Sequence, residues 1–122
     1  MRMERTPAGT KGVYLGTEID GKWWKRYRRD GFFARGNGVY WVDGLGFNFL
    51  RYLTRKPLTV PFSAVTGVRT GDSHAGRWLM GRRALKLDWS REGSLLSSGF
   101  VVSGRNEETE ALASYLRSVC GL

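Results

Sequence analysis

The sequence predicts a mainly β fold, in which about seven short antiparallel strands precede one C-terminal amphipathic helix. The first observation is a hairpin pattern over Gly38–Leu50, where two apolar runs flank Asp43-Gly44. Such a dipeptide favours a two-residue turn, because both turn positions tolerate a positive φ. The second observation is a series of short alternating segments separated by turn residues. The third is a single apolar stripe near the C-terminus.

A two-residue turn at Asp43-Gly44 would also set the register of this central hairpin. It would place Val42 opposite Leu45 and Tyr40 opposite Phe47, all on one face. That face is strongly apolar, whereas the other face is half polar. This contrast is expected of a sheet that has one side on a core.

The chain before the hairpin divides into a leader and two strands. Residues 1–12 are predicted to form a flexible leader because they are polar and lack periodicity. Residues 13–122 are predicted to form one domain. Val13–Ile19 alternates like a strand, and Asp20-Gly21 would turn it back into Lys22–Arg28.

The segment Lys22–Arg28 fits two interpretations. Trp23, Trp24 and Tyr27 would share one side of a helix, at spacings of three and four. The aromatic content and the preceding turn favour a strand instead, and the helix stays open as the alternative.

Further strands are expected after the hairpin, each with apolar residues at alternate positions. Pro61 cannot donate to a ladder, so it marks an edge, a bulge or the end of its strand. The polar, glycine-bounded segment Gly71–Gly76 is predicted to be a loop. The expected strands are Leu58–Phe62, Ala64–Thr70, Ala84–Ser90 and Leu95–Ser103.

The terminal helix is expected over residues 107–119. Asn106 is a suitable N-cap, and three glutamates near the start complement the helix dipole. Gly121 stands where a C-terminal stop is expected. The apolar stripe that should cover the β domain consists of Leu112, Tyr115, Leu116 and Val119.

This order of elements resembles the pleckstrin-homology-like (PH-like) superfold, particularly its bacterial and GRAM-type members. The resemblance extends from about Gly36 to Val119 and is carried first by the central hairpin. The stretch Val60-Pro-Phe-Ser-Ala-Val65 is similar to an apolar-Pro-apolar-x-x-apolar segment of such proteins. The resemblance implies an antiparallel barrel closed at one end by the helix. It also implies a binding module for phosphoinositide headgroups, peptides or partner domains.

The chain has 122 residues, a formal net charge of +9 and a pI of about 10.3. This excess favours anionic partners, namely nucleic acid, anionic lipid or acidic protein surfaces, although ordinary solubility charge explains it equally well. The single Cys120 excludes an intramolecular disulfide. No apolar run approaches the roughly 18 residues of a membrane span. The cytoplasm is the expected location, and peripheral attachment to a membrane is compatible with it.

An enzyme is not expected, because the candidate catalytic residues do not form a working set. His74 is the only histidine, and its neighbours Asp72 and Ser73 cannot form a triad with it from one loop. It is predicted to be a solvated loop histidine. Cys120 is predicted to be a packed or idle thiol. One histidine and one cysteine do not supply a metal site, so neither a metal nor a cofactor is expected.

The basic and aromatic segment Lys22–Arg29 is the best candidate for a functional site. Five of its eight residues are cationic and the other three are aromatic. Cations attract phosphates, and tryptophans stack on bases or lie at a lipid interface. The alternative is that the aromatics pack inward below a solvated cationic face. The expected contact residues are Lys22, Trp23, Trp24, Lys25, Arg26, Arg28 and Arg29. Two other basic groups carry the same ambiguity, namely Arg77, Arg82 and Arg83 beside Trp78, and Arg51, Arg55 and Lys56.

The sequence therefore favours a noncatalytic binding or scaffold domain that contacts a protein partner or anionic lipid headgroups. The alternative is a small basic β-barrel that binds single-stranded nucleic acid. Nucleic-acid binding would depend steeply on salt and discriminate little among polymers of equal charge.

Overall fold

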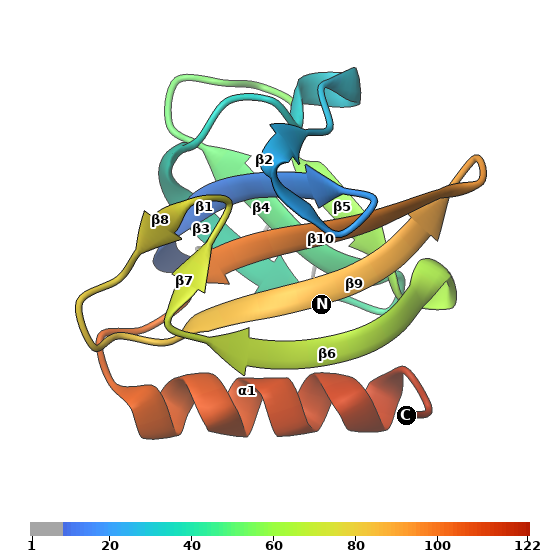
Figure 1. Ribbon diagram of the computed structural model, residues 1–122. Coiled ribbons are helices and arrows are strands. Elements are labelled where there is room, and N and C mark those ends of the chain that lie inside the picture. Colours follow the sequence, from blue (N-terminus) through green and yellow to red (C-terminus); the bar gives the residue numbers. More distant parts are fainter. Residues whose placement is uncertain (1–8) are drawn as a thin grey trace.

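A curved antiparallel sheet forms the body of the molecule in the computed structural model, which describes residues 9–122 (Figure 1). Its strands are β1 (Thr10–Ile19), β2 (Lys22–Arg26), β3 (Gly36–Val42), β4 (Gly46–Arg51), β5 (Leu58–Pro61), β6 (Val65–Gly71), β9 (Ala84–Arg91) and β10 (Ser94–Val101). The remaining elements are the hairpin β7 (Ser73–His74) and β8 (Arg77–Trp78), the 3-10 turns η1 (Arg29–Gly31) and η2 (Phe62–Ala64), and the helix α1 (Asn106–Val119).

The expected fold class is confirmed, since the fold is mainly β and antiparallel with one C-terminal helix. The strand order is β5-β4-β3-β1-β10-β9-β6, and β2 pairs with β1 beside this path. Within residues 9–122 the outer strands β5 and β6 are not paired with each other. The sheet is therefore strongly curved rather than a fully hydrogen-bonded barrel.

The strand β1 lies at the centre of the sheet, between β3 and β10. A flexible leader was predicted for residues 1–12, of which residues 1–8 lie outside the described residues. The last three residues, Thr10–Gly12, already belong to β1. That part of the prediction is wrong. A Cβ on Gly12 would lie 2.7 Å from the carbonyl oxygen of Val101, so this glycine permits close approach of β10.

The central hairpin forms, but its register differs from the prediction by two residues. Val42 pairs with Phe47 instead of Leu45, because the turn is centred on Gly44 and Leu45. The carboxylate of Asp43 accepts hydrogen bonds from the backbone N–H groups of Leu45 and Gly46, at 2.9 and 3.0 Å. This is the role of aspartate at the first position of a turn, and it moves the turn one residue along the chain.

The other strands predicted after the hairpin are present as β5, β6, β9 and β10. Pro61 ends the outer strand β5, as its missing donor requires. The segment Gly71–Gly76 is not a simple loop, since it contains β7 and turns into β8. The turn residues Ala75 and Gly76 have φ values of 52° and 81°, a pair of positive values typical of a tight hairpin.

The helix α1 lies along the sheet beside β6 and β9 (Figure 1). Its buried residues are Thr109, Ala113 and Leu116, so the packed face is rotated from the predicted stripe. Tyr115 and Val119, which were expected to be buried, are 54% and 41% exposed.

The two ends of α1 correspond only partly to the sequence signals. The N-cap is Arg105, so the prediction for Asn106 is wrong. The side chain of Asn106 instead accepts from the backbone N–H of Arg83 and donates to the carbonyl of Gly81. The stop at Gly121 is confirmed, since this residue has a φ of 74° just beyond the last turn.

Two clusters of buried apolar side chains lie on opposite sides of β1. The larger cluster fills the curve of the sheet and is rich in aromatics, including Tyr14. Leu15 points to the other side, where it packs with Leu79, Ala84 and Val101. The outer face of β1 is therefore covered by the segment that carries β7 and β8.

Candidate functional site

The predicted segment Lys22–Arg29 begins as the strand β2 beside β1, so the strand interpretation holds as far as Arg26. Trp23 and Trp24 are exposed, at 58% and 62% of their surface, whereas Tyr27 is buried. The inward packing weighed from the sequence therefore applies only to Tyr27. The cationic side chains of Lys22, Lys25, Arg28 and Arg29 are exposed.

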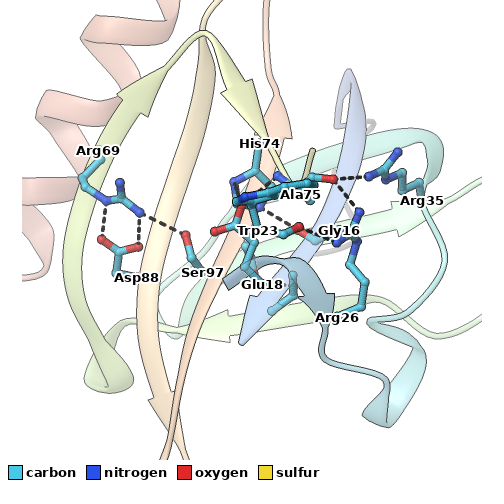
Figure 2. Close-up of polar contacts among 12 residues, drawn as sticks. Gly16, Glu18, Trp23, Arg26, Arg35, Arg69, His74, Ala75, Asp88 and Ser97 are labelled. Carbon is cyan, nitrogen blue, oxygen red and sulfur yellow. Dashed lines mark hydrogen bonds and ion pairs between the residues drawn. The ribbon is translucent and has the colours of Figure 1, made fainter. Parts of the chain in front are cut away.

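The β7–β8 hairpin is held against β2 by arginine side chains (Figure 2). Arg26 donates to the carbonyl of Trp23 at 2.8 Å and to the carbonyl of Ala75 at the hairpin tip. Arg35, just before β3, donates to the same carbonyl of Ala75 at 2.6 Å. The ring of Trp23 packs so closely that a Cβ on Gly76 would lie 3.2 Å from it.

These contacts create an open depression of about 580 Å³, which we call the tryptophan–arginine surface. Beside it, the guanidinium of Arg28 lies 4.5 Å from the centre of the Phe33 ring, a cation–π contact. Sequence reasoning missed Phe33 and Arg35, which lie on the segment between η1 and β3. The surface is lined by Trp23, Trp24, Arg26, Phe33, Ala34 and Arg35.

The electrostatics of this surface are those of unneutralised cations. Burial, together with the nearby charges of Arg26 and Arg77, lowers the pKa of Arg35. Among residues 9–122, none of these arginines has a carboxylate within ion-pair distance. Several carboxylates elsewhere are engaged, for example Asp88 with Arg69 at 2.6 and 2.8 Å. In the described part of the chain, this surface therefore carries positive charge without a paired carboxylate.

His74 belongs to β7, and its side chain is buried beneath the hairpin, so its prediction as a solvated loop residue is wrong. The imidazole is fully buried, with Nε2 3.1 Å from the carbonyl oxygen of Gly16 and Nδ1 3.7 Å from Glu18 Oε2. Burial lowers its pKa to about 4. The ring covers Gly99, where a Cβ would lie 2.3 Å from it. No local pattern predicts this burial, because it depends on the hairpin folding over β1.

Glu18 connects the histidine to the hairpin tip. Its Oε2 accepts a hydrogen bond from the backbone N–H of Ala75 at 2.7 Å, on the side opposite the arginines (Figure 2). The backbone of Ala75 is thus held at both its donor and its acceptor. This double attachment fixes the position of the tip, and with it the arginines of the surface.

The two other basic groups found in the sequence are partly structural. Arg83 bonds to Thr70 and pairs with Glu110, so it connects β6 to the helix. Arg51 donates to the carbonyl of Ala34 and supports the segment that carries the surface. In these two groups, Arg77, Arg82, Arg55 and Lys56 remain exposed.

The comparison with protein families agrees with this architecture. A family model described as bacterial PH domain-like matches residues 2–116. The chain belongs to the bacterial PH domain-like family. The resemblance stated from the sequence is confirmed, and the match also includes β1 and β2, which lie before Gly36. No curated protein and no solved structure matches significantly.

Membership of the bacterial PH domain-like family indicates the general class of function. PH-like domains are generally noncatalytic modules, and this family indicates a binding or scaffold module. Within residues 9–122, no helix of this bacterial PH-like domain is long and apolar enough to cross a membrane.

Proposed function

We propose that this bacterial PH-like domain binds an anionic lipid surface, without catalysis, through the tryptophan–arginine surface and its flanking cations. The observation that carries the proposal is the exposure of Trp23 and Trp24 beside Lys22, Lys25 and Arg28, which form no ion pair with a carboxylate among residues 9–122. Tryptophan combines a large apolar body with one polar N–H, a combination suited to the boundary between headgroups and acyl chains. Lys22, Lys25 and Arg28 would contact lipid phosphates at the same time.

The ring geometry favours a lipid surface over single-stranded nucleic acid. The rings of Trp23 and Trp24 are nearly perpendicular, at 81° with centroids 5.6 Å apart, so they leave no parallel slot for a base. The guanidinium of Arg28 occupies one face of Phe33. Base stacking needs free aromatic faces. An interfacial location needs only exposed apolar edges near cations, which this surface offers.

The test compares two variants with equal charge loss in vesicle flotation. The site variant carries Lys22→Gln, Lys25→Gln and Arg28→Gln, and leaves Arg26 intact because Arg26 holds the hairpin. The control variant changes three exposed cations outside this surface, Lys11, Arg82 and Arg105, to Gln. The vesicles contain phosphatidylcholine with or without phosphatidylglycerol.

We expect the site variant to lose affinity for the anionic vesicles roughly 100-fold, since three surface cations at about 1 kcal/mol each contribute about 3 kcal/mol. The control variant should lose only a few-fold. Equal losses in the two variants would contradict the proposed location. Binding of the parent chain to oligonucleotides but not to vesicles would favour the nucleic-acid alternative.

A further inference from the structure

Two arginines meet at the tip of the β7–β8 hairpin, and a third, Arg77, belongs to the hairpin itself. Arg26 comes from β2 and Arg35 from the segment before β3, yet both donate to the carbonyl oxygen of Ala75 (Figure 2). Arg77 is the first residue of β8, two residues after Ala75, where it pairs with His74 of β7 and is exposed. One carbonyl oxygen accepts two hydrogen bonds, so the acceptor is fully used.

The cluster retains many unused donors. A guanidinium has five N–H donors. Within residues 9–122, the guanidinium of Arg26 donates to two carbonyl oxygens and that of Arg35 donates to one. The side chain of Arg77 donates to none of these residues. The carboxylate of Glu18 faces His74 and the backbone N–H of Ala75 and forms no ion pair with these arginines. Among residues 9–122, these like charges are therefore held together without a carboxylate paired to them.

We infer that Arg26, Arg35 and Arg77 bind a single phosphomonoester group, a specificity site that rests on the proposed lipid-binding function. A phosphomonoester has three terminal oxygens and a charge close to −2 near neutral pH. A phosphodiester has only two such oxygens and one charge. Guanidinium groups bind phosphate oxygens in bidentate geometry. Three guanidiniums therefore provide one partner for each terminal oxygen of the monoester and more than compensate its charge.

The surroundings of the cluster suit a headgroup at the end of a lipid. Trp23 packs on Gly76 at the hairpin tip, so an apolar ring lies directly beside the arginines. Trp24 is in contact with Trp23 and exposed. A phosphate on the arginines would thus have tryptophans next to it at the level where acyl chains begin. A soluble phosphomonoester would use the same arginines without these rings.

The experiment compares phosphatidate with phosphatidylglycerol vesicles at equal surface charge, using the full chain. Arg77→Gln removes one cation of the cluster without removing a hydrogen bond to residues 9–122. Lys25→Gln is the matched control, because it removes the same charge from an exposed cation that flanks the tryptophan–arginine surface. We expect the parent to prefer phosphatidate about tenfold, which corresponds to one charge-assisted contact. Arg77→Gln should abolish this preference, whereas Lys25→Gln should weaken binding to both lipids equally.

Two results would overturn the phosphomonoester site, namely equal affinity of the parent for the two lipids, or an unchanged preference in Arg77→Gln. Failure to bind any vesicle would refute the proposed function separately. In that case the site is tested with inorganic phosphate, by following the NMR chemical shifts of the arginine Nε–H groups during a phosphate titration. Shifts that weaken below about pH 6, where the dianion is lost, would support a soluble phosphomonoester ligand. The absence of any chemical-shift change would overturn the site both for a lipid headgroup and for a soluble phosphomonoester.

Discussion

Acidification should destabilise this protein through the buried His74. Its imidazole is fully buried, and within residues 9–122 its Nδ1 has no hydrogen-bond partner. Burial lowers the pKa of His74 from 6.5 to about 4, and the nearby carboxylate of Glu18 opposes this shift only in part. The folded protein therefore holds the imidazole in its neutral form.

The size of the effect follows from the difference between the two pKa values. Below pH 6.5 the unfolded chain binds a proton at His74, whereas the folded protein does so only near pH 4. The stability associated with His74 is thus complete above pH 6.5 and is lost as the pH falls toward 4. The full loss is about 3 kcal/mol, of which about 1.4 kcal/mol is already lost at pH 5.5.

The assay is urea unfolding of the parent and of His74→Gln at about pH 7.5 and 5.5. Glutamine keeps a polar amide but does not titrate, so the free energy of unfolding should fall by about 1.4 kcal/mol more in the parent. Identical pH dependence in the two proteins would refute the reasoning. An independent check is the NMR titration of His74, which needs no assignment because the chain has one histidine. A measured pKa near 6.5 would contradict its burial.

Three further substitutions test the packing by urea or thermal unfolding. Leu116→Ala should cost about 2–5 kcal/mol because the side chain is buried beneath α1, and a change under about 0.5 kcal/mol would place that face in solvent. Gly99→Ala should cost about 1–3 kcal/mol, since its Cβ would meet the ring of His74 at 2.3 Å, and an unchanged midpoint would contradict that contact. Asp43→Ala should cost roughly 1–2 kcal/mol through two lost turn hydrogen bonds, whereas a neutral effect would argue against the observed turn.

Elements could be predicted from the sequence where the signal is local. Alternating residues gave β9 and β10, and turn residues gave the ends of most strands. The central hairpin shows why the face of the sheet on which a side chain lies is easier to predict than its cross-strand partner. A two-residue shift moved Val42 from Leu45 to Phe47, yet Tyr40 and Phe47 still share one face, because side chains alternate with a period of two.

The misses concern contacts between segments distant in the sequence. His74 lies in a polar stretch and becomes buried only because β7 folds onto Gly16 and Gly99. Arg35 joins Arg26 through the carbonyl of Ala75, which is 40 residues further along the chain. The helix face was predicted from apolar residues alone. The sheet instead packs against the small Ala113 and Thr109, which allow a close approach.

The most direct test of the account is the depth of the tryptophans in a bound vesicle. Intrinsic fluorescence of a reference protein would be recorded with anionic vesicles whose acyl chains carry bromine atoms, which quench nearby tryptophans. Trp41 and Trp78 are replaced by Phe in the reference protein, because both are at least partly exposed. In this reference we expect a blue shift and strong quenching, both largely lost when Trp23→Ala and Trp24→Ala are added, since the remaining Trp89 is buried. Vesicle binding with the same emission and quenching in the reference with and without Trp23→Ala and Trp24→Ala would contradict the tryptophan–arginine surface as the membrane contact.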